Sequence, residues 1–406
     1  MRRRDFLGYC TALALSKAVT HPRIAMSHTE RPPQPPPADT VTLFLAGDVM
    51  TGRGIDQILP HPGNPQIFES HSRSAGDYVS LAERTNGPIP RPVGFAYIWG
   101  DALAVLDAAA PDVRIINLET AITRTGSPWP GKGIQYRMHP ANTPCLTSAA
   151  IDCCVLANNH VLDWGHAGLQ ETLSSLTGAA LPVAGAGVNR ALAQAPAVLD
   201  LAGQGRVLVF AAALGSSGVP PDWAATKKRP GVNRLPDLSE QTVEDIARVV
   251  NDHRQPGDVV VMSLHWGGNW GYEIPAAHTR FAHALIETAS VDLVYGHSSH
   301  HPLGVEVYRG KPILYGCGDL IDDYEGISRY GQFRIELALL YLVTLSRTDG
   351  RLVSMEMVPM QRYRFRLKHA SRDDSAWLQQ TLDRESHPFG SRVIQSSDGR
   401  LRLVGS

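Results

Sequence analysis

The chain is poor in the features that identify the simplest classes of protein. Its 406 residues include five cysteines, whose spacing matches no metal-binding pattern and predicts no disulfide framework. No charge of one sign prevails, because 38 lysines and arginines stand against 39 aspartates and glutamates and the net charge is −1. This balance argues against a nucleic-acid-binding protein, which carries a basic patch or stripe. It also argues against an electrostatically driven attachment to a membrane surface.

Long apolar runs are missing from the N-terminal segment as well. The stretch 7–19 is apolar but contains Ser16 and Lys17, so it is too short and too polar for a membrane-spanning helix. It follows the letters RRRDFL at 2–7, which resemble a bacterial twin-arginine export signal. We expect residues 1–27 to be such a signal and the protein to be exported to the periplasm or cell envelope; a cytoplasmic protein with a basic tail is the alternative. Residues 28–39, with RPPQPPPA at 31–38, predict a proline-rich linker.

The rest of the chain has the composition of a globular protein, with 43% hydrophobic residues, and we expect one folded domain over residues 40–366. Short apolar runs predict strands at 41–46, 113–118, 151–157, 207–214, 259–264 and 292–295. Helical spacing predicts helices at 99–110, at 167–176, from 239 to the break at 257–258, and at 275–290. Two hairpins are expected, around 308–312 and 348–350. Residues 58–92 predict a long loop, and residues 367–406 a C-terminal helix and tail. Strands that alternate with helices and end in hairpins favour an α/β fold with mixed β-sheets flanked by helices.

Five of the strand-like runs are followed directly by side chains that can bind a metal. The segments are LFLAGD ending at Asp48, RIINLE ending at Glu119, CCVLANNH ending at His160, VVVMSLHWG with His265, and DLVYGHSSHH with His297, His300 and His301. Each residue taken alone has an ordinary explanation as a turn cap, a loop residue or a buried core histidine. Together they indicate a shared site, because α/β enzymes build their sites at the carboxyl ends of strands.

The kind of ligand narrows the choice of metal. Carboxylate oxygens, an amide oxygen and imidazole nitrogens suit Mn, Fe or Zn better than Cu(I) or an iron–sulfur cluster. Six or seven such side chains exceed the ligands of one tetrahedral zinc. They fit two divalent ions about 3.5–4 Å apart that share a carboxylate, an arrangement that activates water and holds an oxyanion.

Several longer motifs coincide with these segments. They are GDVMTGR at 47–53, NLET at 117–120, LANNHVLDWGHAGLQET at 156–172, VAGAG at 183–187, HWG at 265–267 and GHSSHHPLGVEVYRGKPILYGCGD at 296–319. In this order they resemble the CapA family of capsule or poly-γ-glutamate biosynthesis proteins, which is similar in fold to the calcineurin-like metallophosphoesterases. The resemblance implies a metallo-dependent phosphatase-like sandwich over most of the folded domain.

The resemblance also implies a role for each candidate residue. Asp48 holds one metal, Glu119 bridges, Asn159 holds the second metal, His265, His297 and His300 complete the ligands, and His160 is the general acid. Asn117, Asn158 and Asp163 support the ligands or act as alternative ligands, Arg53 contacts an anion, and His301 competes with His300. The chain departs from the phosphoesterase pattern in two places. The opening Asp-x-His is reduced to Asp48, and two residues, not one, separate His297 from His300.

Two functions follow from these expectations. In the first, the protein is a metal-dependent hydrolase or transferase that acts on a phosphoester or an amide. In the second, it is a non-catalytic accessory protein that binds poly-γ-glutamate or components of the capsule synthetase. Both expect an anionic substrate or polymer as partner and no nucleic acid.

Overall fold

The computed structural model describes residues 39–201 and 205–405, so the predicted signal segment and nearly all of the predicted linker lie outside the described residues. The helices of the described part are α1 (Arg53–Ile58), α2 (Gly76–Asn86), α3 (Ala102–Ala109), α4 (Pro144–Thr147), α5 (Gly165–Gly178), α6 (Arg190–Gln194), α7 (Glu240–His253), α8 (Ala276–Thr288) and α9 (Arg372–Ser386). None of them is long and apolar enough to cross a membrane.

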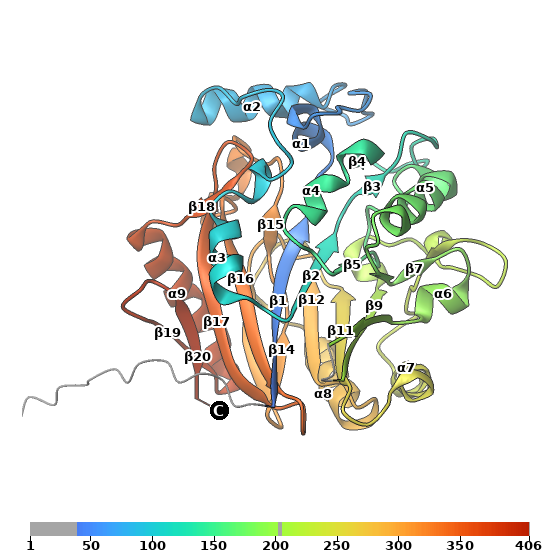
Figure 1. The fold of residues 1–406 in the computed structure, drawn as a ribbon, viewed down its shortest axis with the longest axis vertical. Helices are drawn as coiled ribbons and strands as arrows, with labels where there is room; N and C mark the ends of the chain where they lie inside the picture. The colour runs from blue at the N-terminus through green and yellow to red at the C-terminus, as the bar shows by residue number, and fades with distance from the viewer. Residues whose placement is uncertain (1–38, 202–204, 406) are drawn as a thin grey trace, which may run out of the picture. The chain divides into compact units, whose positions relative to one another are not determined.

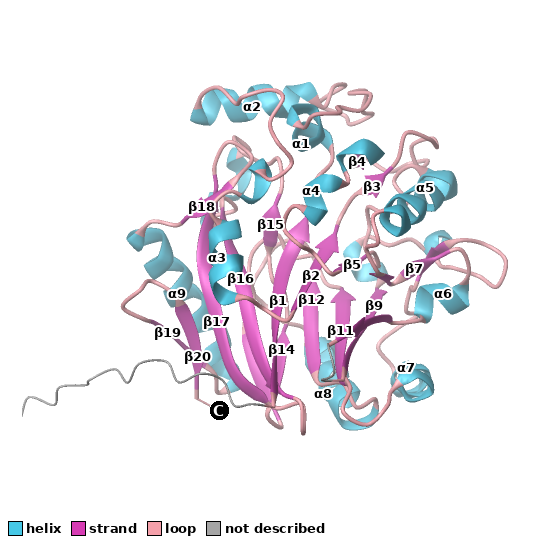
Figure 2. Ribbon diagram, in the orientation of Figure 1, coloured by secondary structure: helices cyan, strands magenta, loops and turns pink. Residues whose placement is uncertain are grey.

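Two mixed β-sheets form the centre of the described part (Figures 1 and 2). The larger has ten strands: β19 (Arg392–Gln395), β20 (Leu401–Val404), β17 (Leu352–Arg362), β16 (Leu337–Ser346), β1 (Thr40–Val49), β2 (Val113–Leu118), β5 (Cys153–Val155) and β6 (Val183–Ala184) in this order, with β15 (Asp319–Ile321) on β1 and β18 (Leu367–His369) on β17. The smaller has six: β13 (Val305–Tyr308), β14 (Lys311–Leu314), β12 (Leu293–His297), β11 (Val259–His265), β9 (Arg206–Ala213) and β8 (Ala197–Asp200). Two short ribbons pair β10 (Gly231–Val232) with β7 (Ala186–Gly187) and β3 (Ala121–Ile122) with β4 (Arg137–Met138).

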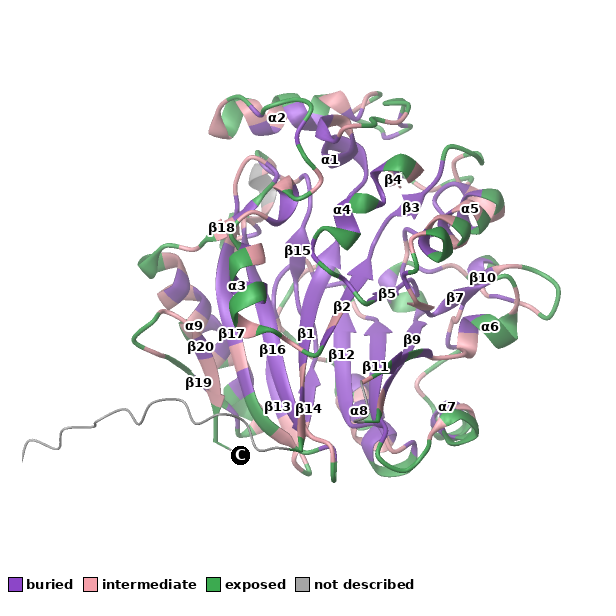
Figure 3. Cartoon of the chain, viewed as in Figure 1, coloured by how far each residue is buried: buried purple, intermediate pink, exposed green. Residues whose placement is uncertain are grey.

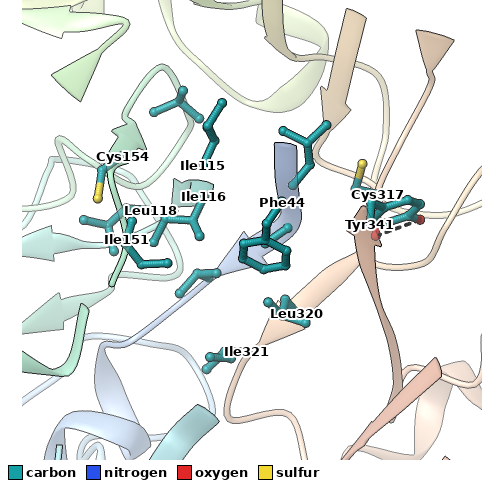
Figure 4. Packing of buried hydrophobic residues seen from close by; sticks show 14 of the residues in the cluster. Phe44, Ile115, Ile116, Leu118, Ile151, Cys154, Cys317, Leu320, Ile321 and Tyr341 are labelled. Atoms are coloured by element: carbon teal, nitrogen blue, oxygen red, sulfur yellow. Dashed lines mark hydrogen bonds between the residues drawn. The ribbon is translucent and has the colours of Figure 1, made fainter. Parts of the chain in front are cut away.

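The two sheets pack face to face around one core. Val207, Val209 and Ala211 of β9 lie in the same buried cluster as Phe44 of β1 and Ile115 of β2, and Figure 4 shows part of this packing around Phe44. The alternate residues of β9 and β11 point the other way and pack against α7 and α8 in a second cluster. Because side chains alternate across a strand, coverage on both faces explains why these strands read as unbroken apolar runs.

This arrangement confirms the predicted α/β fold, with mixed sheets flanked by helices. The predicted strands and both hairpins are present, with β13 and β14 antiparallel around 309–310 and β16 and β17 antiparallel around 347–351. The prediction of a loop over residues 58–92 was wrong in part, because α2 forms within it. The helix was missed because only Tyr78, Val79 and Ala82 of its eleven residues are buried, so its apolar stripe is too narrow to read from the sequence.

The segment after residue 366 continues the larger sheet. Strand β18 pairs with β17, α9 follows, and the β19–β20 hairpin returns to β17. The burial pattern in Figure 3 shows the central strands buried and the outward sides of the helices exposed, whereas β19 and β20 are largely intermediate or exposed. The carboxyl ends of β1, β2, β11 and β12 lie at the same end of the fold, beneath α1 and α2 (Figure 1).

Candidate metal centre

Parallel pairing brings the predicted strand-end residues together. In the larger sheet β1 runs parallel to β2, with Asp48 opposite Asn117. In the smaller sheet β11 runs parallel to β12, with His265 opposite His297. The hydroxyl of Tyr295 on β12 accepts a hydrogen bond from the amide of Ala46 on β1 over 3.1 Å and so ties the two sheets together just below these ends. The strand-end side chains of both sheets therefore meet in one place.

Asp48, Glu119 and His265 form the centre of this group. One ligand atom from each lies within 4.8 Å of the others, and all three residues are buried. Asn117 orients two of them, because its Nδ2 donates to Asp48 Oδ1 over 2.7 Å and lies 3.3 Å from His265 Nδ1. His265 Nε2 lies 3.7 Å from Glu119 Oε1. Two oxygens and a nitrogen held this closely are a donor set for Mn, Fe or Zn.

His297 is a buried side chain of this group whose ring nitrogens lack hydrogen-bond partners. It is 1% exposed, and neither of its ring nitrogens makes a hydrogen bond. Its Nδ1 lies 3.2 Å from Asp48 Oδ1, without the alignment of a hydrogen bond. Buried polar groups in folded proteins are nearly always satisfied, and a cation between the ring and the carboxylate would satisfy this one. The residues present thus fit a divalent metal.

The electrostatics of the group point the same way. Burial, and then the charges of Asp48 and Asp319, raise the pKa of Glu119 well above its usual range. Burial would raise the pKa of Asp48 too, but the neighbouring rings of His297 and His265 outweigh it and hold that pKa at about 2. Burial lowers the pKa of His265 to about 3. Metals bind neutral imidazoles and ionised carboxylates, so His265 and Asp48 are in the binding form, whereas Glu119 would release its proton when a cation binds.

His160 lies beside the centre with one nitrogen held and the other free to face the cleft. Its Nδ1 lies 2.6 Å from Asp163 Oδ2, and Lys132 forms an ion pair with the same carboxylate. The ring stacks on Tyr136 with centroids 3.8 Å apart, and its Nε2 lies 3.9 Å from Glu119 Oε1. Burial lowers the pKa of His160 to about 4. Asp163 therefore positions the ring so that Nε2 faces the cleft.

The two neighbouring asparagines have different environments. Asn158 is fully buried; its Nδ2 donates to Asn117 Oδ1 and the Leu118 carbonyl, while its Oδ1 accepts from the amides of His160 and Val161. All of its polar groups are used to shape the turn. Asn159 has its Oδ1 3.1 Å from His265 Nε2 and lines the cleft. The structure brings Asn159, and not the side chain of Asn158, within reach of a metal near His265.

The two neighbouring histidines His300 and His301 also have different environments. His300 Nδ1 lies 2.9 Å from Asp319 Oδ2, its Nε2 lies 2.9 Å from Asn269 Nδ2, and the residue lines the cleft. His301 turns away and stacks on Phe333 with centroids 4.4 Å apart. The sequence pattern did not identify Asp319 as a site residue. In the structure β15 pairs with β1, and Asp319 lies opposite Asp48. Its signal was weak, because GCGD at 316–319 reads as a turn.

Arg53, the expected anion contact, is engaged inside the protein. Its Nε donates to Asp323 Oδ2 over 3.0 Å and its Nη1 to Glu69 Oε1 over 2.9 Å. The guanidinium lies 3.5 Å from the centroid of the Tyr78 ring. The structure thus places Arg53 in a buried ion-pair cluster at the wall of the cleft.

The cleft above these residues has a volume of about 830 Å³. Its floor includes Glu119, Asn159, His160, Ser298 and His300. Its walls are mostly aromatic and aliphatic: Tyr78, Tyr136, Trp270, Tyr324, Tyr330, Leu81, Ile134, Ile327 and Ile335. Arg53 and Lys132 are the arginine and lysine that line it among the described residues, and both form ion pairs with aspartates.

Comparisons with known proteins give a consistent result. The family model described as "Bacterial capsule synthesis protein PGA_cap" matches residues 42–324. A Mycobacterium tuberculosis protein named "Probable polyglutamine synthesis accessory protein" is 49% identical over 367 residues, which cover 90% of this chain and 96% of that protein. The "PGA biosynthesis protein CapA" of Bacillus subtilis is 24% identical over 288 residues, or 70% of this chain and 64% of that protein. A crystal structure of a Mycoplasma pneumoniae phosphatase aligns with TM-score 0.44 and 10% identity over 82% of this chain and 96% of that one; a structural likeness of this size carries no argument about function.

Proposed function

The chain belongs to the bacterial capsule synthesis protein family PGA_cap, and from this premise we propose that it is a metal-dependent hydrolase or transferase in poly-γ-glutamate synthesis or export. The relatives' names speak of polyglutamine and PGA biosynthesis, which supports the biological process. The chemistry is our proposal and rests on the strand-end cluster.

One observation carries the chemistry: two ring nitrogens of His297 are buried without a hydrogen-bond partner next to Asp48, Glu119 and His265. Such groups favour a bound cation, because each unsatisfied buried polar atom costs about 1–3 kcal/mol. Divalent ions held here, of Mn, Fe or Zn, would activate water and stabilise the charge that develops on a phosphoryl or acyl oxygen.

The surrounding residues divide the remaining work. The ions would be held by Asp48, Glu119, Asn159, His265 and His297. Asn117 orients Asp48 and His265 through its amide.

His160 handles the proton of the leaving group. Its neutral ring donates from Nδ1 to Asp163, so Nε2 is the free nitrogen; it would accept a proton from the attacking water and then give that proton to the leaving group, as in general acid–base catalysis. Asp163 keeps the ring in this orientation, and Lys132 in turn neutralises Asp163.

The cleft also limits how an anionic substrate binds. Arg53 and Lys132 already neutralise Asp323 and Asp163, so neither is free to pair with a row of substrate carboxylates. One anionic group is therefore held at the floor by the metal, and the uncharged part of the substrate lies along the tyrosines and Trp270. A polyanion such as poly-γ-glutamate is engaged at a single bond.

A non-catalytic accessory role is the second candidate, and one finding favours it: the word "accessory" in the name of the relative at 49% identity. In that case the metal site would hold a carboxylate of the polymer or of a synthetase component without breaking a bond. The two candidates differ in turnover, not in metal content.

The test measures turnover and binding on the same preparation. Protein loaded with Mn²⁺, and the same protein stripped with a chelator, is assayed on bis(p-nitrophenyl) phosphate and on poly-γ-glutamate. The hydrolase proposal expects metal-dependent turnover of at least one of them. Binding of poly-γ-glutamate with no turnover of either compound supports the accessory role instead.

We also propose that the protein is exported through the twin-arginine route, a proposal that rests on the letters RRRDFL at 2–7. Changing Arg3 and Arg4 to lysine should leave the protein in the cytoplasm, as measured by cell fractionation. Normal export of that variant would reject the route.

A further inference from the structure

Three buried carboxylates lie at the strand ends below the cleft, although the proposed roles account for only two of them. Asp48, Glu119 and Asp319 are each 1–3% exposed. Asp319 opens β15, which pairs in parallel with β1, and the register sets Asp319 directly opposite Asp48. Paired residues of neighbouring strands lie about 5 Å apart with their side chains on the same face. The third carboxylate therefore enters the same site as the first.

The protein neutralises the other aspartates around the cleft with its own cations. Asp163 pairs with Lys132, Asp322 with Arg362, and Asp323 with Arg53. Among the described residues, no lysine or arginine forms an ion pair with the side chains of Asp48, Glu119 or Asp319, whose charged contacts are all to histidines. Burying a carboxylate without a paired cation is costly, so a bound metal ion would supply the charge that no lysine or arginine ion pair supplies to this group among the described residues.

His300 is placed to share a cation with Asp319. Its Nδ1 lies 3.0 Å from Asp319 Oδ1 and 2.9 Å from Oδ2. Two ligand atoms bound at about 2.1 Å to one ion lie about 3.0–3.4 Å apart, so this spacing is close to that of neighbouring ligands on one metal. His300 also lines the cleft, whereas His301 does not.

We infer that Asp319 is a metal ligand: together with His300 it holds a second divalent cation, next to the one held by Asp48, Glu119 and His265. Glu119, which has a ligand atom within 4.8 Å of those of Asp48 and His265, would serve as the carboxylate that the two ions share. This inference rests on the metal centre of the proposed function and adds a ligand that the strand-end motifs did not identify.

The experiment counts ions and does not depend on turnover. Full-length protein is loaded with Mn²⁺ and freed of excess metal, the manganese per chain is measured by mass spectrometry, and EPR reports whether two ions are spin-coupled. The wild-type protein should hold two coupled ions, and Asp319→Asn should hold one, with the coupling lost. Asp322→Asn is the matched control: its carboxylate lies three residues further on and pairs with Arg362, so it should retain both ions.

Asp319→Asn with the same manganese content and coupling as the wild-type protein would overturn the inference. If that variant does not fold, crystals of the manganese-loaded wild-type protein provide the test. Anomalous scattering from manganese should then give a peak within bonding distance of Asp319. A single peak near Asp48 and His265 alone would overturn it. If wild-type protein holds two coupled ions but hydrolyses nothing, the hydrolase proposal fails and the assignment of Asp319 stands.

Discussion

Two clusters of charged side chains lie at the cleft. They differ in whether every buried polar group has a hydrogen-bond or ion-pair partner within the protein. In the Arg53 cluster the guanidinium is paired with Asp323 and Glu69 and lies against Tyr78. In the strand-end cluster His297 has two buried nitrogens without a hydrogen-bond partner, and within the described residues no lysine or arginine forms an ion pair with its carboxylates. The charges of the first cluster are paired within the protein. Under the proposed function, the second cluster is completed by a cation, and this difference separates a structural cluster from a functional one.

The largest effect should come from removing a ligand in the strand-end cluster. Asp48→Ala or His297→Ala should lose bound metal and reduce turnover by more than the roughly 10²–10⁴-fold expected for loss of an acid–base group. Asp112→Ala is the control, since this exposed carboxylate lies at the opposite end of β2. Metal analysis and turnover are measured on the same samples. Full metal content in both ligand variants would place the site elsewhere.

His160 should affect turnover and not metal content. His160→Ala removes a ring that Asp163 holds at Nδ1, so activity should fall by about 10²–10⁴-fold while most of the metal stays. His166→Ala, on the adjacent helix α5 and outside the cleft lining, should be close to wild type. If His160→Ala empties the site, His160 is a ligand and its role as the acid is wrong.

The Arg53 cluster should respond in the opposite way. Arg53→Met leaves the buried carboxylates of Asp323 and Glu69 without their cation, which should lower the free energy of unfolding by about 3–5 kcal/mol. Bound metal should remain. Urea denaturation measures the change, and Arg309→Met, whose pair with Glu287 is exposed, should cost at most about 1 kcal/mol. Loss of metal in folded Arg53→Met would contradict the division into two clusters.

The smallest effect concerns His301, a buried histidine that faces aromatic rings instead of carboxylates. Burial lowers its pKa to about 4, below the ordinary value of about 6.5. The neutral ring thus contributes stability that is complete above about pH 6.5 and is lost as the pH falls toward 4. His301→Phe should keep its metal and lose less thermal stability than wild type between pH 7.5 and 5. An unchanged pH dependence, equal to that of the exposed control His71→Phe, would contradict this.

The sequence predicted the strands and most of the strand-end residues for a physical reason. Strands buried on both faces are apolar throughout, so a carboxylate or histidine directly after one is conspicuous. Asp48, Glu119, His160, His265 and His297 all follow this rule, and the structure brings them together.

The features that the sequence did not predict depend on contacts between residues that are distant in the sequence. Asp319 follows a glycine-rich stretch, and only its pairing with β1 reveals its place. Arg53 was expected to contact an anion, but the carboxylate that occupies it lies 270 residues further along the chain. Helix α2 covers the cleft with few buried residues. In each case the decisive partner is a tertiary one that no local pattern encodes.

The most direct test of the metal centre is the elemental content of the wild-type protein. It is purified without chelator, incubated with Mn²⁺, Fe²⁺ or Zn²⁺, desalted, and analysed by mass spectrometry. A strand-end cluster that needs a cation should retain at least one ion per chain, and Asp48→Ala should lose it. Less than about a tenth of an equivalent after loading with each metal would contradict the account.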